Sequence, residues 1–142
     1  MVDIVARGSQ VLLRRPRPAD RREMLLRNAA SARLYRGWAT PMRTSAQFSS
    51  YLARCRRDDY EGLLICRTAD LAIVGACNLS QIVRGAFQSA YLGYQVFVPF
   101  EAQGYMSAAM PLVLRHVFQA LKLHRVEANI QPENHASLAL AR

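Results

Sequence analysis

Lysine is nearly absent from this sequence, so its positive charge comes almost entirely from arginine. Lys122 is the only lysine, although Lys and Arg together number 19 and the formal net charge is +9. So strong an arginine bias more often follows genome base composition than a phosphate-binding face. No helix-turn-helix pattern and no interleaving of lysines with aromatic residues accompanies it. The sequence therefore predicts no direct, sequence-specific binding of nucleic acid, and arginines at helical spacing indicate a solvated helix face.

Cysteine is also scarce, and its spacing suggests no pairing. Cys55, Cys66 and Cys77 are odd in number, and no two of them form C-x-x-C. The histidines lack the H-x-x-x-H spacing of metal ligands: His116, His124 and His135. We expect reduced, mostly buried thiols and no metal site.

Long apolar runs are missing as well. No stretch approaches the roughly 20 uninterrupted apolar residues that span a bilayer. Residues 1–10 contain no apolar block of the kind found in a signal peptide. These absences predict a cytoplasmic protein without membrane contact. The composition, 51% hydrophobic and 20% charged over 142 residues, suits one globular domain over residues 1–142.

The first half of the chain predicts one strand and two helices. Residues 11–14 form the strand, and a helix with Pro18 in its opening turn follows. Its apolar residues predict an inward stripe of Leu25, Leu26, Ala29 and Ala30. Thr44 and Gln47 have the spacing of a capping box that opens a second helix ending near Arg57. The apolar face of that helix consists of Phe48, Tyr51, Leu52 and Cys55.

The second half predicts strands around a central helix. Residues 63–67 and 71–79 read as a hairpin joined by residues 68–70, and a third strand covers residues 89–98. After Gly104 the period becomes helical, with one face made of Ala109, Leu112, Val113, His116, Val117 and Ala120. Residues 125–130 read as a further strand, and another helix opens at Asn134. A strand, a helix and a parallel strand form a βαβ crossover, so the sequence predicts an α/β fold with a mixed central sheet and flanking helices.

The segment 96–107 contains the most informative chemistry. A strand ends there, a turn containing Gly104 follows, and a helix begins. The unpaired N–H groups and dipole of a helix start attract phosphate oxygens, and a glycine lets a diphosphate approach closely. One glycine at a helix start is by itself more often an ordinary turn.

Several motifs in order give this segment a stronger meaning. Residues 101–106 resemble the coenzyme motif Q/R-x-x-G-x-G/A of the GNAT acetyltransferase superfamily. Residues 84–94, 123–128 and 132–137 resemble the ribosomal-protein-alanine N-acetyltransferase branch of that superfamily. The resemblance is detailed from residue 71 to residue 142. Two positions depart from the motif, because Glu101 replaces Gln or Arg and Met106 replaces Gly or Ala.

The resemblance implies a set of site residues. The expected acetyl-CoA or coenzyme A contacts are Val96, Phe97, Gln103, Gly104, Tyr105, Met106, Ser107 and Asn134. The family's acid tyrosine is replaced by Ala141, so Ser137 is the expected acid for the leaving thiolate. Glu127 is expected to be structural, and Asn129 stands where some relatives have a base glutamate. The expected base lies on a strand beyond Arg142.

The resemblance also implies the reaction and leaves its acceptor open. The expected activity is acetyl transfer from acetyl-CoA to a primary amine, above all the N-terminal amine of a ribosomal or other protein. A polyamine or aminoglycoside-type acceptor is the alternative enzyme, and a non-catalytic coenzyme-binding or ribosome-associated module is the alternative of another class. Because the family continues with two further strands, we expect residues 1–142 to be a partial domain without its C-terminal strands. Such a chain is expected to transfer little acetyl and to form a homo-oligomer through an open sheet edge.

Overall fold

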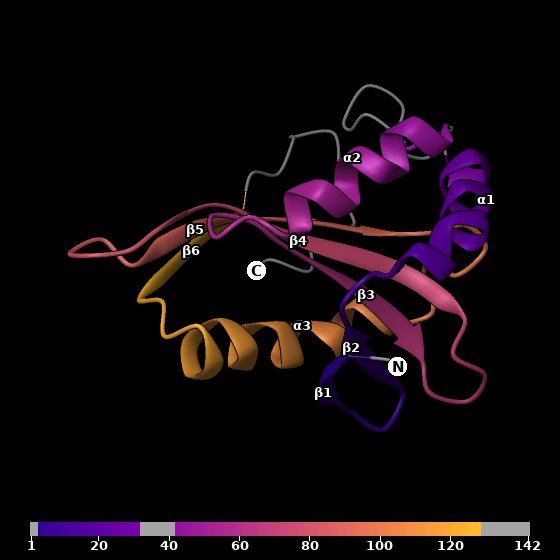
Figure 1. Ribbon diagram of the computed structural model, residues 1–142. Coiled ribbons are helices and arrows are strands. Elements are labelled where there is room, and N and C mark those ends of the chain that lie inside the picture. The colour runs from indigo at the N-terminus through magenta and orange to yellow at the C-terminus, as the bar shows by residue number, and fades with distance from the viewer. Residues whose placement is uncertain (1–2, 32–41, 129–142) are drawn as a thin grey trace.

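A single mixed sheet organises the protein. The computed structural model describes residues 3–31 and 42–128, and six strands follow one another across its sheet in chain order (Figure 1). The strands are β1 Ile4–Arg7, β2 Val11–Arg14, β3 Glu61–Arg67, β4 Ile73–Val83, β5 Ser89–Val96 and β6 Arg125–Ala128. The helices are the short η1 Pro18–Asp20, α1 Arg21–Ser31, α2 Ser45–Cys55, α3 Tyr105–Arg115 and the π-helical turn η2 His116–Ala120.

Strand pairing confirms the predicted crossover. Neighbouring strands from β1 to β5 pair antiparallel, whereas β5 and β6 pair parallel from Ser89 with Arg125 to Leu92 with Ala128. Helix α3 makes the connection between β5 and β6, as parallel neighbours require. The α/β fold with a mixed sheet and a βαβ unit is therefore confirmed.

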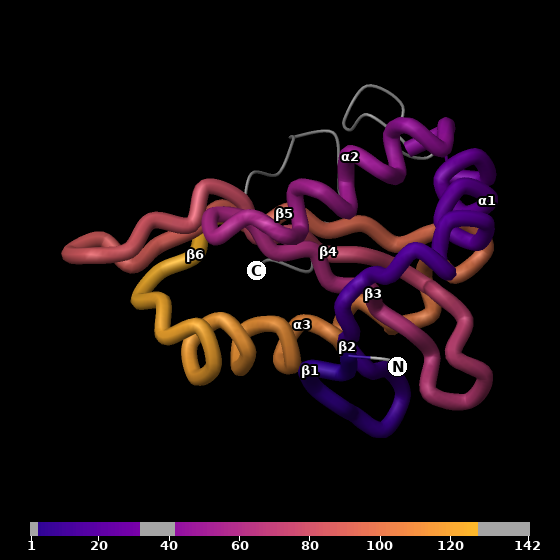
Figure 2. Tube along the Cα trace, viewed as in Figure 1, coloured from indigo at the N-terminus to yellow at the C-terminus, as the bar shows by residue number. Residues whose placement is uncertain are grey.

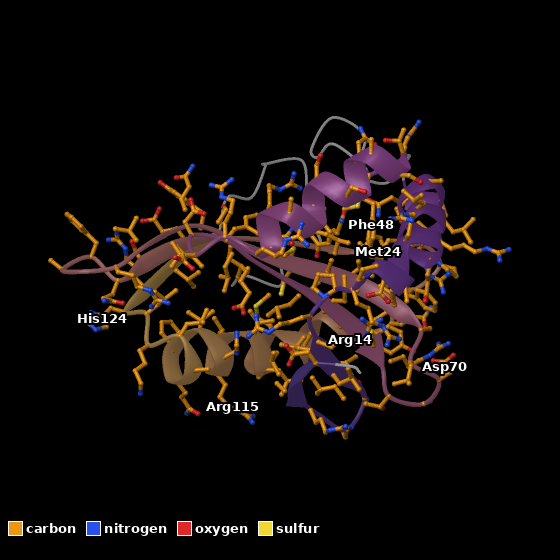
Figure 3. The ribbon with its side chains drawn as sticks, viewed as in Figure 1. Arg14, Met24, Phe48, Asp70, Arg115 and His124 are labelled. Carbon is orange, nitrogen blue, oxygen red and sulfur yellow. The ribbon has the colours of Figure 1, made fainter. Side chains whose placement is uncertain are left out.

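Helices cover the two faces of the sheet separately. Figure 1 shows α1 and α2 on one face and α3 on the other. Met24 and Phe48 lie together between the first two helices and the sheet (Figure 3). On the other face, α3 buries Ala109 and Val113 completely, and the η2 turn after it buries Val117. Each face thus has its own apolar core, and the alternation of side chains along each strand separates the two.

The second helix begins as predicted. Thr44 Oγ1 accepts from the Gln47 N–H at 3.1 Å, and Gln47 Oε1 accepts from the Thr44 N–H at 3.0 Å. This reciprocal pair is the capping box. Phe48 and Tyr51 are buried as expected, while the helix ends at Cys55, two residues earlier than predicted.

The cysteines are free, as expected. Cys66 and Cys77 are buried and Cys55 is half-buried. Burial raises the pKa of the Cys77 thiol to about 12, so this thiol stays protonated at neutral pH. Within the described ranges, no group of three His, Cys, Asp or Glu is placed to hold a metal ion, and no helix is long and apolar enough to cross a membrane.

Three predictions about the elements were wrong. Strand β1 was missed, because a four-residue edge strand shows no alternation and forms through its pairing with β2. Ala120 is exposed, because η2 widens the helix before it ends. The buried residues of α1 are Met24, Asn28 and Ser31; of the predicted stripe only Leu25 packs against the core, while Leu26 is 61% exposed and Ala29 and Ala30 are exposed too. The predicted helix from Asn134 lies outside the described residues.

Candidate active site

The turn between β5 and α3 ends on a glycine with a backbone conformation that favours glycine. Gly104 is the N-cap of α3 with φ 81°, and no atom lies within 4 Å of the position that a Cβ would take. The helix start leaves the N–H groups of residues 104–107 without acceptors in the helix, and no acidic residue lies in its first turn. Open space, unpaired donors and the positive end of the dipole together fit a diphosphate.

The residues beside Gly104 have distinct environments. Tyr105 lies edge-on to Phe100 with ring centroids 6.2 Å apart, Met106 is buried in the core, and Ser107 is exposed. Because the Met106 side chain points inward, a phosphate would meet only its backbone N–H. This explains how methionine fits a motif position that usually holds Gly or Ala.

Two polar side chains of the turn, Gln103 and Glu101, differ in their surroundings. Gln103 Nε2 donates to the Pro99 carbonyl at 2.8 Å, so this side chain closes the turn. Glu101 is exposed to solvent. Water therefore screens the carboxylate that departs from the motif.

At the end of β5, the backbone groups of Val96 and Phe97, the two predicted backbone contacts of the coenzyme, point in different directions. The Phe97 N–H donates to the Val74 carbonyl at 2.9 Å, and the Phe97 carbonyl accepts from Phe100 at 2.7 Å. Both groups of Phe97 are thus used within the chain. The same ladder makes Gly75 and Val96 a non-hydrogen-bonded pair, so the N–H and C=O of Val96 point away from β4, toward the β6 side. Both backbone contacts remain predictions.

Helix α1 bonds the turn and the neighbouring start of β4 through three polar residues at a spacing of four: Ser31 bonds the turn, and Glu23 and Arg27 bond Ile73. The Val98 N–H donates to Ser31 Oγ at 2.9 Å, and Arg27 Nε donates to the Ile73 carbonyl at 3.1 Å. Glu23 Oε2 accepts from the Ile73 N–H at 2.8 Å. Sequence reasoning missed these residues, although Glu23, Arg27 and Ser31 recur every four positions, which places them on one helix face.

Two arginines, each paired with a carboxylate, pack on the aromatic ring of this turn. The guanidinium carbons of Arg27 and Arg67 lie 4.7 Å and 5.1 Å from the centroid of the Phe100 ring. Arg67 also donates to the Tyr105 hydroxyl at 3.2 Å. Its bonds to Asp70, together with the Ala72 N–H, hold the pKa of Asp70 at about 2. Arg27 is likewise paired with Glu23 at 3.3 Å, so each guanidinium here has a carboxylate partner and the pairs add little net charge to the α3 start.

The residues expected to perform the proton transfers are described only in part. Glu127 on β6 is exposed and pairs with Arg125 at 3.3 Å. Asn129, Asn134, Ser137 and Ala141 lie outside the described residues. Their roles, like those of all the predicted site residues, stay predictions.

Comparisons with known proteins identify the family to which this chain belongs. Residues 10–142 match the family described as Acetyltransferase (GNAT) domain. Over 92 residues the chain is 35% identical to "Probable N-acetyltransferase YjcK" of Bacillus subtilis, with 65% of this chain and 51% of that protein covered. Over 65 residues it is 35% identical to the ribosomal protein uS5-alanine N-acetyltransferase of Escherichia coli, with 46% of this chain and 34% of that protein covered. The chain thus spans about half or less of the length of these relatives.

Solved structures share the fold. Mycobacterium smegmatis RimJ in complex with CoA-disulfide superposes with a TM-score of 0.83 at 26% identity, covering 98% of this chain and 71% of that one. Spermidine N-acetyltransferase from Vibrio cholerae in complex with CoA and spermine has a TM-score of 0.81 at 18% identity, covering 94% of this chain and 79% of that one. The second similarity shows the fold alone.

Proposed function

Because the chain belongs to the GNAT acetyltransferase family, we propose that residues 1–142 belong to a single acetyltransferase domain, one that transfers the acetyl group of acetyl-CoA to a primary amine. The observation that carries this proposal is the start of α3. There Gly104 adopts a positive φ and leaves room for a diphosphate. We expect Gly104, Tyr105, Met106 and Ser107 to bind the diphosphate through backbone N–H groups, with Gln103 shaping the turn.

The chemistry needs little covalent help from the protein. Acetyl-CoA supplies a thioester, so that a C–N bond to the neutral amine forms as the C–S bond breaks. The amine nitrogen loses one proton to a base or to water, and the leaving thiolate takes up one proton from the acid, so that coenzyme A leaves as the thiol. The protein's part is to orient the reactants, to donate to the developing oxyanion and to provide an acid. We expect Val96 and Phe97 to offer backbone groups to the coenzyme arm and the acetyl carbonyl, Asn134 to contact the coenzyme arm and Ser137 to act as the acid.

The proposed acceptor is the N-terminal α-amino group of a ribosomal or other protein. Support comes from the Escherichia coli relative, whose name states that it acetylates an alanine of ribosomal protein uS5. A small amine is the second candidate, since a spermidine acetyltransferase shares the fold.

An acceptor panel tests the proposal. Thiol release from acetyl-CoA is measured with alanine-initiated peptides, their N-acetylated counterparts and spermidine. We expect release only with free N-terminal amines, and a peptide mass increased by one acetyl group. Release with spermidine alone would move the assignment to small amines. Tight coenzyme binding without any release would indicate a non-catalytic coenzyme-binding or ribosome-associated module.

A further inference from the structure

The sheet face that carries α1 and α2 becomes polar toward its β5 side. Antiparallel partners place their side chains on the same face, so Asn78 on β4 and Gly93 on β5 lie side by side on this face. Gln95 belongs to it too, because its partner Ala76 packs in the core beneath α1 and α2. Intervening residues such as Cys77 and Leu92 pack on the opposite face, against α3. The alternation of side chains along β4 and β5 therefore fixes Asn78, Gly93 and Gln95 on the same face of the sheet.

Asn78 has an acceptor that the described chain does not use. Its Oδ1 atom is buried and has no hydrogen-bond partner among the described residues, while the residue as a whole keeps partial exposure. A buried acceptor without a donor is costly, and folded proteins seldom leave one without a reason. A donor from a bound molecule would supply the missing bond.

Gly93 leaves room beside this acceptor. It is exposed, and no atom lies within 4 Å of the position that a Cβ would take. Gly62, which pairs with Asn78 from its other side on β3, has no such space, because a Cβ there would lie 2.6 Å from Tyr51 Oη. A side chain at position 93 would thus fill open space without straining the sheet, which makes Gly93 a clean steric probe.

The position suits an attacking amine. A coenzyme arm that starts at the N-terminus of α3 and passes Val96 runs back along β5, and Gly93 lies about 10 Å before Val96 on that strand. We propose that Asn78 is a positioning residue for the acceptor, an inference that rests on the proposed transfer reaction. Its Oδ1 accepts a hydrogen bond from an amine N–H that lies over Gly93.

The charges of this face favour a single ammonium or amine group followed by a neutral chain. Among the described residues of β4 to β6 on this face, Glu127 is the one carboxylate, and it pairs with Arg125 at 3.3 Å. A polyamine would need several carboxylates to hold its several charges, and a chain of net charge +9 repels it further. The acceptor is therefore assigned as a peptide N-terminus.

Two variants test the assignment, with Ser80→Ala as the control on the same strand and face. Asn78→Leu removes the acceptor, and Gly93→Val fills the space above the strand. For each protein we measure the thermal midpoint, the Kd for coenzyme A, the acceptor KM and kcat with an alanine-initiated peptide. Peptide binding to the coenzyme A-loaded chain is followed separately by fluorescence anisotropy, so that binding is read without turnover.

The expected result separates positioning from structure. Both variants should raise the acceptor KM and the peptide Kd about tenfold while the Kd for coenzyme A stays unchanged. Asn78→Leu should keep or raise the thermal midpoint, since it removes an unpaired polar atom; a structural asparagine would lower it. Unchanged peptide binding in both variants, or no peptide binding by the unaltered chain, overturns the assignment. Peptide binding that depends on Asn78 without any thiol release leaves the assignment standing and refutes acetyl transfer instead.

Discussion

Ser31 and Val98 are 67 positions apart in the sequence, and the Val98 N–H donates to Ser31 Oγ at 2.9 Å. This bond joins the last residue of α1 to the turn that leads from β5 to α3. The trace in Figure 2 shows the two segments meeting at the end of the sheet where α1 lies. The first helix, which contributes no residue of the motif, thus holds the backbone that the motif depends on.

Removing this hydroxyl should weaken both the turn and its ligand. Ser31→Ala leaves the Val98 N–H without its acceptor, which should lower the free energy of unfolding by about 1–3 kcal/mol. We expect the affinity for coenzyme A to fall as well, because the turn is no longer fixed. Urea denaturation and calorimetry measure the two effects. Ser49→Ala, on the exposed side of α2, is the control, and equal values for the two variants would show that the bond fixes nothing.

Gly62 is required by the packing of α2 on β3. A Cβ there would lie 2.6 Å from Tyr51 Oη and 2.7 Å from Cys55 Sγ. Gly62→Ala should therefore cost about 1–3 kcal/mol of stability, as overpacking does. The Tyr51 hydroxyl has no hydrogen-bond partner among the described residues, so Tyr51→Phe should cost little and make room. A double variant that recovers none of the loss would refute this steric cause, which a double-mutant cycle measures directly.

Glu61 should make stability depend on pH. His116 Nε2 lies 2.8 Å from its Oε2, and Arg15 pairs with its other oxygen. Burial opposes the charge of this carboxylate, but His116 and Arg15 outweigh it and lower the pKa of Glu61 below its ordinary 4.5. A lowered folded-state pKa gives stability that is present above the ordinary pKa and lost as the pH falls through the folded-state value.

The stability of Glu61→Gln should therefore approach that of the unaltered chain in acid. We expect the gap in the free energy of unfolding to be largest near neutral pH and to shrink as the pH falls below the ordinary pKa of Glu61. Urea denaturation across this range provides the measurement. A gap that stays constant with pH would assign the effect to packing and not to charge.

Much of the fold follows from local signals in the sequence. The Thr44 and Gln47 pair marked a helix start, because both side chains bond the backbone of their own helix. Alternation and turn residues located β3 to β5 for the same reason. The inward face of α1 could not be predicted this way. Glu23 and Arg27 face inward because they bond the backbone of Ile73, a contact that exists only after β4 has folded beside them.

The candidate site also contains some features that local sequence predicts and others that depend on contacts between distant segments. The place of Gly104 at the start of α3 could be predicted from the strand before it and the helical period after it. Its part in coenzyme binding comes from the resemblance of residues 101–106 to the GNAT motif and stays a prediction. Phe97 shows the opposite case, since only the register of β4 and β5 reveals that its N–H is already bonded to Val74. Asn78 and Gly93 also become neighbours only through that register.

Ser137 should affect turnover more than binding. If it gives a proton to the leaving thiolate, Ser137→Ala lowers kcat, because an acid acts in the transition state, while the Kd for coenzyme A changes little. Steady-state kinetics with a free N-terminal peptide measure kcat, and Ser50→Ala on α2 is the control. Equal kcat values for the two variants would show that Ser137 gives no proton to the leaving thiolate.

Coenzyme binding at the start of α3 is the central claim, and two glycines make a matched test of it. Gly104 and Gly85 have φ values of 81° and 75°, and nothing lies within 4 Å of a Cβ at either position. Gly85 belongs to the hairpin between β4 and β5, which projects at the far end of the molecule from the start of α3 (Figure 2). Valine should therefore strain the backbone equally at both, but only at position 104 should it enter the diphosphate path.

The deciding measurement is a calorimetric titration of coenzyme A into the unaltered chain, Gly104→Val and Gly85→Val. We expect the unaltered chain and Gly85→Val to bind alike and Gly104→Val to bind at least about tenfold more weakly. Equal affinity in all three proteins would contradict a diphosphate site at the N-terminus of α3.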